Sequence, residues 1–276
     1  MGVSKVASDE DYYTIKSDIP GVDKRVVDNL FQQMENESAP LLKRLLTTSK
    51  IEFSANEREQ LSMFLACLQS RTPLTQEKFR KLDSTTNLHF LKIFASNREQ
   101  FHKAMRTSGS NESDEKLEEF RQYVLDGGMS IEYLPESDDY FLRTQLEAAQ
   151  WIGPMMEAKQ WHILESTTSR VFVTSDNPVS IVRPDNIPHQ MGVGFENGHI
   201  MLPLSPTRCL FMDNRKDTRI LKAQRHHVTF FNYHTIFGAH EAVFASLLSK
   251  DIESAFNKTQ SGANTEVSVL DTEIYK

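Results

Sequence analysis

The sequence contains few of the patterns that mark specialised protein classes. Only two of its 276 residues are cysteines, Cys67 and Cys209, and both stand among apolar residues. Two distant thiols make no disulfide framework and lack the C-x-x-C spacing of metal sites. They predict buried free thiols in a reducing, cytoplasmic location. No apolar run approaches the ~20 residues that cross a membrane, and the first residues show no signal-peptide pattern.

The chain also lacks the basic excess that is typical of nucleic-acid-binding scaffolds. Its formal net charge is −7, and 25% of its residues are charged. This balance gives no support to a nucleic-acid partner, although a local basic patch on an acidic body is compatible with a nuclease. The hydrophobic fraction of 39% is ordinary for a globular protein. We expect one domain, residues 1–276, with a sizeable core.

Most catalytic and cofactor signatures are missing as well. Gly192-Val193-Gly194 lacks the third glycine and the following helix of a phosphate-binding loop. No G-x-S-x-G elbow and no kinase motif set occurs. His227 and His234 share a helical face, but they lie about 10 Å apart along the axis, too far for one metal ion. No cofactor is evident, and a divalent metal has no support.

Residues from about 20 to 159 are predicted to be helical. Apolar residues recur near helical spacing over 22–48, where Pro40 marks either a kink or a second helix capped by Ser38. Ser54-Ala55-Asn56-Glu57 is a capping box that starts the next helix, and Pro73 ends it.

Three further helical stretches follow. The first runs over 74–106, and a short amphipathic helix over 116–125 ends at Gly127-Gly128. The last, over 138–159, is expected to break near Gly153-Pro154. The stretch over 74–106 has these apolar anchors: Phe79, Leu82, Phe90, Phe94 and Phe101.

From about residue 160 to 213 the pattern changes to short β-branched and aromatic-rich runs separated by turn signals. They predict an antiparallel sheet of four or five strands, at 161–164, 170–174, 179–182, 200–204 and 208–212. Helical spacing returns over about 224–249, and the tail 259–276 is predicted to be loose. The expected fold is α+β, with an N-terminal helical bundle packed on a small antiparallel sheet and a C-terminal helix.

The turn Thr174-Ser175-Asp176-Asn177-Pro178 is the most site-like feature. A predicted strand delivers the Asp176 carboxylate and the Asn177 amide at its end. Such groups orient a water, bind a metal or hold a ligand hydroxyl. The alternative is an ordinary turn, because Asp and Asn side chains also bond their own backbone.

Arg71 is the second candidate. It falls on the apolar face of its helix after Leu61 and Leu68, and an inward guanidinium needs a carboxylate partner. Glu35, at the edge of an apolar stripe, is the natural candidate, and Gln69 lies on the same surface. These residues indicate either a polar pocket between two helices or a helix end where Arg71 reaches water.

Together these segments resemble a bacterial domain-of-unknown-function family, number 4238. The resemblance covers roughly residues 9–248 and implies no activity, but it places the turn and the Arg71 segment in one arrangement. Members usually begin with a His-Tyr-containing segment followed by Pro, so we expect a shortened N-terminus here. The matching segments, in chain order, are Asp11-Tyr12-Tyr13, Glu35, Gln69-Ser70-Arg71-Thr72-Pro73, Phe172 to Val179, Leu202-Pro203-Leu204-Ser205-Pro206 and Asn232.

We therefore expect an intracellular, hydrolytic, enzyme-like domain that binds an anionic ligand. Asp176 and Glu35 are the candidate catalytic carboxylates, with Asp176 as general base or metal ligand. Arg71 is expected to bind the phosphate or carboxylate of the ligand, assisted by Asn177, Gln69 and Ser175. The alternative is a non-enzymatic module that binds a partner protein or small ligand, as in a bacterial toxin or phage-response system. In that case Arg71 and Glu35 form a structural ion pair and Asp176 caps a turn.

Overall fold

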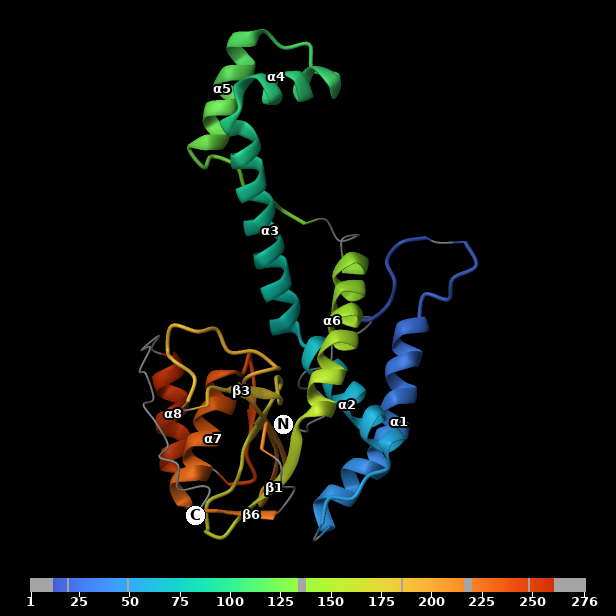
Figure 1. Ribbon diagram of the computed structural model, residues 1–276, viewed down its shortest axis with the longest axis vertical. Coiled ribbons are helices and arrows are strands. Elements are labelled where there is room, and N and C mark those ends of the chain that lie inside the picture. The colour runs from blue at the N-terminus through green and yellow to red at the C-terminus, as the bar shows by residue number, and fades with distance from the viewer. Residues whose placement is uncertain are drawn as a thin grey trace.

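The computed structural model describes residues 12–18, 20–48, 50–133, 138–184, 186–215, 220–247 and 249–260. Its helices are α1 (Val26–Thr47), α2 (Ala55–Ser70), α3 (Pro73–Ser96), α4 (Arg98–Thr107), α5 (Asp114–Leu125), α6 (Asp138–Ala158), α7 (Arg225–Phe237) and α8 (Lys250–Gln260). Its strands are β1 (Gln160–Ser166), β2 (Thr174–Ser175), β3 (Ser180–Val182), β4 (His199–Ser205), β5 (Arg208–Asp213), β6 (Ile220–Ala223) and β7 (Val243–Phe244). Figure 1 shows the main sheet between the α7–α8 pair and helices α1, α2 and α6, while α3, α4 and α5 project from this body as an arm. The α+β prediction is confirmed.

The main sheet has five strands in the order β3-β4-β5-β1-β6. The pairs β3–β4, β4–β5 and β5–β1 are antiparallel, as predicted, but β6 pairs parallel with β1. The sheet is therefore mixed, and the prediction of a purely antiparallel sheet was wrong at this edge. The short strand β6 was not foreseen.

The strand predicted over 170–174 is reduced to Thr174–Ser175, which pairs with β7 in a separate two-stranded sheet. The reason is a side chain that takes the place of a neighbouring strand. The Asn232 amide donates to the Val171 carbonyl at 2.8 Å, and its oxygen accepts from the Val173 backbone N–H at 3.0 Å. One side chain thus satisfies backbone groups that a strand partner would otherwise bond.

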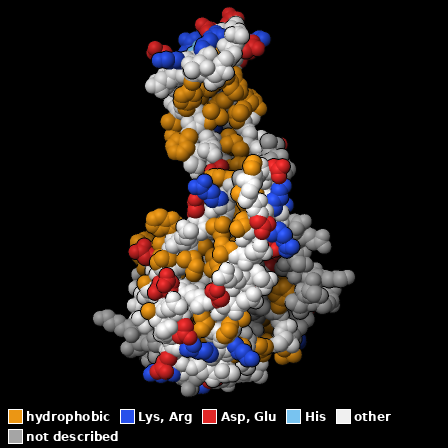
Figure 2. All heavy atoms as spheres, turned by 90° about the vertical axis from the view of Figure 1, so that its right-hand side faces the viewer, with side chains coloured by type: hydrophobic (Ala, Val, Ile, Leu, Met, Phe, Trp, Pro, Cys, Tyr) orange, Lys and Arg blue, Asp and Glu red, His pale blue; other side chains and the backbone are white. Residues whose placement is uncertain are grey.

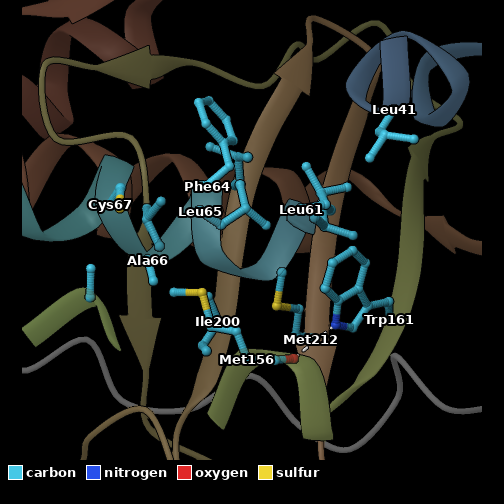
Figure 3. Packing of buried hydrophobic residues seen from close by; sticks show 14 of the residues in the cluster. Leu41, Leu61, Phe64, Leu65, Ala66, Cys67, Met156, Trp161, Ile200 and Met212 are labelled. Atoms are coloured by element: carbon cyan, nitrogen blue, oxygen red, sulfur yellow. Dashed lines mark hydrogen bonds between the residues drawn. The ribbon is translucent and has the colours of Figure 1, made fainter. Parts of the chain in front are cut away.

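One face of the main sheet packs on α1, α2 and α6. Trp161 and Met212 are cross-strand neighbours on this face, and both are buried. Figure 3 shows them packed against Leu61, Leu65 and other residues of the helical layer. The Trp161 indole donates to the Met156 carbonyl at 2.9 Å, so the buried N–H is satisfied. Burying a leucine of this kind stabilises the fold by roughly 1.5–3 kcal/mol.

The opposite face of the sheet packs on α7. Phe211 of β5 lies against Phe231, with ring centroids 5.8 Å apart, and Val228 belongs to the same buried cluster. Cys209 also belongs to it, while Cys67 lies in the cluster on the other face. Both thiols are free and buried, as predicted. Burial raises the pKa of each, to about 11 for Cys67.

Two helices continue through prolines where the sequence predicted a boundary. Helix α1 contains Pro40, so no second helix starts with Ser38 as its cap. Helix α6 contains Pro154 and reaches Ala158, so the predicted break does not end it. Gly153 lies against Met63 of α2, where a Cβ would stand 3.2 Å from the Met63 Cε. Tertiary packing against α2 therefore outweighs the lost backbone hydrogen bond at Pro154.

The predicted helix over 224–249 is much shorter. Helix α7 ends at Phe237, with Gly238 as its C-cap, and β7 and α8 follow. Side chains of the turn after β2 capture the backbone just beyond Gly238, as described below, and this prevents the helix from continuing. Most of the predicted loose tail, 259–276, lies outside the described residues.

Residues 74–106 were predicted as one helical stretch, but Asn97 divides this stretch into α3 and α4. The Asn97 side chain caps α4 by accepting from the Gln100 N–H at 3.1 Å. Of the predicted apolar anchors, Phe101 is buried with Ala95 and Val124 of the arm. Leu82, Phe90 and Phe94 are exposed instead, so their predicted anchoring role was wrong. Figure 2 shows hydrophobic side chains gathered on the neck of the arm, below a tip that carries charges.

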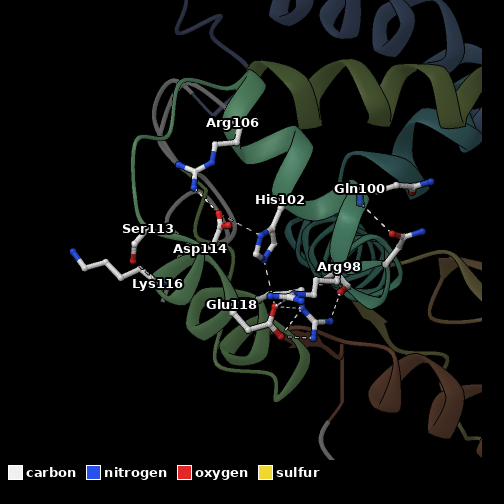
Figure 4. A network of polar contacts seen from close by, with 11 residues as sticks. Arg98, Gln100, His102, Arg106, Ser113, Asp114, Lys116 and Glu118 are labelled. Atoms are coloured by element: carbon white, nitrogen blue, oxygen red, sulfur yellow. Dashed lines mark hydrogen bonds and ion pairs between the residues drawn. The ribbon is translucent and has the colours of Figure 1, made fainter.

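Ion pairs join α4 to α5 at the tip of the arm. Arg98 contacts Glu118 at 2.9 Å, and the His102 ring lies 3.3 Å from the same carboxylate (Figure 4). Hydrogen bonds from Arg121 lower the pKa of Glu118 to about 2. The tip therefore holds its own geometry without help from the body. In the described part of the chain, no helix combines the length and the apolar character needed to span a bilayer.

Candidate functional site

The two sequence segments that suggested a site meet in the structure. The Thr72 hydroxyl lies 3.4 Å from the side-chain oxygen of Asn177, and both residues are buried. Thr72 is also the N-cap of α3, where its hydroxyl accepts from the Thr75 N–H at 3.3 Å. The root of the arm is thereby placed against the turn after β2.

Ser175 and Asn177 are occupied by hydrogen bonds within the protein. The Ser175 hydroxyl donates to the Asn177 carbonyl at 2.9 Å and accepts from the Asn177 N–H at 3.2 Å. The Asn177 amide donates to the Gly238 carbonyl at 2.9 Å. These bonds hold the end of α7 against the turn. Both residues therefore have a structural role, and their predicted part in ligand binding stays a prediction.

The Asp176 carboxylate grips the loop after α7. It accepts from the backbone N–H groups of His240 at 2.9 Å, Glu241 at 2.6 Å and Ala242 at 3.1 Å. The Asp176 N–H in turn donates to the Ala242 carbonyl at 3.1 Å. A carboxylate that accepts from three backbone N–H groups of one loop holds that loop in place. The catalytic role predicted for Asp176 stays a prediction that this geometry does not favour.

Arg71 forms the ion pair that the sequence suggested. Its guanidinium lies 2.6 Å from a Glu35 oxygen, and the side chains are 16% and 43% exposed respectively. The guanidinium also lies over the Phe31 ring at 5.1 Å, and the Tyr13 hydroxyl donates to the Arg71 carbonyl at 3.2 Å. The guanidinium group of Arg71 is thus held in the helical layer against an aromatic ring, which favours the cation. No hydrogen bond or ion pair between described residues joins Arg71 or Glu35 to Asp176.

Further polar groups lie beside Arg71, where α2, α3 and α6 meet. The Tyr12 hydroxyl bonds the side chain of Gln76 on α3, and burial raises the pKa of Tyr12 to about 12. The tyrosine is therefore a neutral donor near neutral pH. In the described part of the chain, the buried Gln69 Oε1 and Arg80 Nε have no hydrogen-bond partner, while Gln145 interacts with the Tyr12 hydroxyl. Buried polar atoms are nearly always bonded, so their partners are to be sought in water or a ligand.

Sequence reasoning missed a buried charged group at one end of the main sheet. His162 and Asp213 are both fully buried and lie 3.0 Å apart. Hydrogen bonds from His162 and from the Arg215 backbone outweigh the effect of burial and lower the pKa of Asp213 to about 2. Lys159, nearby, donates to the Glu196 carbonyl at 3.0 Å, and burial lowers its pKa. Strand alternation could have placed His162 and Asp213 on one face, but their pairing depends on strand register.

A cavity of about 330 Å³ lies between α7, α8 and the segment before β2. It is distinct from the Arg71 cluster, and the sequence reasoning did not find it. Two of its lining residues are arginines, Arg170 and Arg225, which lie in segments that the sequence marked only as a strand and a helix. Helix α8 was not predicted from the sequence. Its residues Asp251, Ile252 and Ala255 complete the wall of the cavity. Among the described residues, no group of three or more His, Cys, Asp or Glu could hold a metal ion.

The fold and these contacts define an α+β protein in which a clamped turn joins a helical layer, a sheet and a projecting arm. Residues 1–247 match the family described as "Protein of unknown function (DUF4238)", and the chain belongs to this family. Comparison with curated proteins and with solved structures found no match. The family resemblance seen in the sequence is thus confirmed, while the predicted shortening of the N-terminus stays a prediction.

Proposed function

We propose that this protein binds an anionic ligand through Arg71, at the junction of α2 and α3. The observation that carries the proposal is the state of the guanidinium. It is mostly buried, it rests on an aromatic ring, and its carboxylate partner Glu35 is far more exposed than Arg71 itself. An incoming phosphate or carboxylate can take the place of Glu35 at the guanidinium, because the half-exposed Glu35 carboxylate can turn to water when it is displaced. Arginine binds such groups in a planar, bidentate manner.

The neighbouring groups suit the rest of such a ligand. Tyr12 is a neutral hydroxyl, and the buried Gln69 Oε1 has no hydrogen-bond partner among the described residues. A ligand hydroxyl or amide that donates to Gln69 would remove the cost of leaving this atom unpaired, about 1–3 kcal/mol. The buried thiols fit a reducing bacterial cytoplasm as the setting.

We propose ligand binding and not hydrolysis, because the contacts of Asp176, the expected general base, do not favour that role. For Asp176 to accept a proton, its carboxylate would have to weaken three backbone hydrogen bonds. Glu35 is better viewed as a competitor for Arg71 than as a catalytic group. The function that the arrangement supports is therefore reversible ligand binding.

Isothermal titration calorimetry with inorganic phosphate and pyrophosphate tests this function. We expect saturable binding of pyrophosphate by the wild-type chain and a loss of about tenfold or more in Arg71→Gln, since one charge-assisted pair is worth about 1.5–3 kcal/mol. Glu35→Gln should bind more tightly, because it removes the competing carboxylate.

Arg44 provides a matched control. Like Arg71, it pairs with a glutamate, Glu57, and lies over a ring, Phe53, at 4.8 Å. Arg44→Gln should leave the affinity unchanged. Equal losses in Arg44→Gln and Arg71→Gln, or weaker binding by Glu35→Gln, would contradict a site at Arg71.

A second candidate function, partner-protein binding, is favoured by the arm. Helix α3 packs on α5 with one face, while Leu82 and Phe90 on its outer face are 65% and 63% exposed. Exposed apolar patches of this kind often mark protein interaction sites. Light scattering over a concentration series tests whether the partner is a second copy of the chain. The double variant Leu82→Ser/Phe90→Ser should then remain monomeric where the wild type associates.

A further inference from the structure

We propose a second binding site, for a small amphipathic anion, in the cavity between α7 and α8. The charged head of the ligand, a carboxylate or a phosphate monoester, lies at Arg225, and its short apolar body lies against Ile236 and Ile252. This site shares no residue with the Arg71 cluster and does not depend on the function proposed there.

The size and position of the cavity suit a small organic molecule. Its volume of about 330 Å³ is at the lower end of the range for small-molecule sites. Residues of α7 form one wall, residues of α8 form the other, and Thr168 to Val171 close one side. Three chain segments far apart in the sequence therefore converge on one hollow, as is typical of ligand sites.

The charges around the cavity favour an anion. Its charged lining residues are two arginines and one aspartate, so the lining is net positive. Arg170 is already engaged, because it forms an ion pair with Asp251 and donates to the Thr229 hydroxyl at 2.8 Å. Arg225, the first residue of α7, is exposed and has no ion pair with any described residue. Arg225 is thus the cation available to a ligand.

The other part of the lining is apolar. Ile236 and Ile252 are buried in one hydrophobic cluster with Val173, and Ala255 packs against it. Leu247 lies at the cavity as a largely exposed side chain. A ligand that covered these groups would remove apolar surface from water, which inorganic phosphate cannot do. The lining therefore fits a molecule that carries both an anionic group and an apolar chain.

The walls are held in place before any ligand arrives. Asn232, which lines the cavity, bonds the backbone of Val171 and Val173 and so fixes the segment before β2 to α7. The Arg170–Asp251 ion pair fixes the same segment to α8. A site that is organised in advance loses less conformational entropy when it binds.

Calorimetric titration of the whole chain with four probes tests the proposal: hexanoate, hexyl phosphate, hexanol and inorganic phosphate. We expect saturable binding of hexanoate or hexyl phosphate, and the tighter of the two identifies the head group. Arg225→Gln should weaken that binding about tenfold, since it removes one charge-assisted contact. Ala255→Leu should abolish it by filling the cavity, and leucine is a good helix former, so α8 is retained.

Two controls keep the result specific. Arg143→Gln removes an exposed arginine of α6, and Arg71→Gln removes the cation of the other site. Arg143→Gln should leave the affinity for the alkyl anion unchanged. The Arg71→Gln background, which lacks the cation of the other site, should retain the binding that Arg225→Gln removes. Thermal denaturation of each variant shows that it is folded.

Four results would overturn the proposal. They are the absence of saturable binding by any probe, equal affinity for hexanol and the alkyl anions, equal affinity for inorganic phosphate in the Arg71→Gln background, and unchanged affinity in both Arg225→Gln and Ala255→Leu. A loss in Arg71→Gln alone would place the anion at the α2–α3 junction. That result would support the first proposal and refute this one.

Discussion

The hydroxyl of Thr72 and the amide of Asn177 lie 3.4 Å apart, and this contact links the start of α3 to the turn that secures the end of α7. Each residue has a second task, because Thr72 caps α3 and Asn177 bonds the Gly238 carbonyl. Three parts of the molecule, the arm, the sheet and α7, are therefore joined through two side chains.

The Thr72–Asn177 contact should contribute little by itself, although each residue matters. At 3.4 Å the hydrogen bond is long and therefore weak. We expect Thr72→Val to lower the free energy of unfolding by about 1 kcal/mol through loss of the cap, and Asn177→Ala to lower it by about 1–3 kcal/mol. Urea denaturation of both single variants and the double variant should give a coupling energy below about 1 kcal/mol. A larger coupling would show that the contact is tighter in solution than 3.4 Å implies.

Asp176 should behave as a clamp. Asp176→Ala removes the acceptor of three backbone N–H groups and should lower the free energy of unfolding by about 2 kcal/mol. Asp176→Asn retains one oxygen acceptor and should cost less. Urea denaturation measures both, and hydrogen exchange at residues 240–242 should rise in the alanine variant. Wild-type stability in Asp176→Ala would contradict the clamp and revive a catalytic role.

Two leucines offer a matched comparison between the body and the arm. Leu61 is fully buried under the sheet, so Leu61→Ala should lower the free energy of unfolding by about 2–5 kcal/mol. Leu82 lies on the exposed face of α3, so Leu82→Ala should change the free energy by less than about 0.5 kcal/mol. Thermal or urea denaturation at low protein concentration tests both. A large loss for Leu82→Ala would mean that the outer face of α3 is covered in solution.

Acid should destabilise the fold in two stages. Burial lowers the pKa of His199, His227 and His234 from 6.5 to about 4. Between these values the unfolded chain binds more protons than the folded one, so stability falls as pH drops from about 6.5 to 4. Asp213, with a pKa of about 2, adds a further loss below about pH 4.

Melting temperatures measured between pH 7 and pH 4 test the first stage, for which we expect a loss of up to about 3 kcal/mol for each of the three rings. His234 is the most direct probe, because only burial shifts its pKa. His234→Gln should flatten the pH dependence. An unchanged slope would show that this ring is already solvated in the folded state.

Local sequence signals predicted the elements that depend on neighbouring residues. The capping box at Ser54 starts α2 as expected, and strands β1, β3, β4 and β5 lie within about two residues of their predicted positions. The Arg71–Glu35 pair could also be anticipated, because an arginine on an apolar helical face requires a carboxylate.

Elements that depend on distant residues could not be predicted. Asn232 replaces a strand partner for Val171 and Val173, and nothing near 171–173 in the sequence signals this. Pro154 predicts a helix break from the sequence alone, and the packing of Gly153 against α2 is visible only in the structure. Leu82 and Phe90 match the pattern of core residues, yet the arm leaves them uncovered, because periodicity does not say whether a face has a neighbour.

The length of α3 sets the distance between the base of the arm and its tip. Its 24 residues extend about 36 Å from the capped base at Thr72 to the tip formed by α4 and α5. A helix anchored at its base and braced at its tip works as a spacer. The tip is therefore held at a fixed distance from the base of the arm. Deleting one turn of α3 would shorten this reach by about 5 Å and rotate the tip, while both ends kept their own contacts.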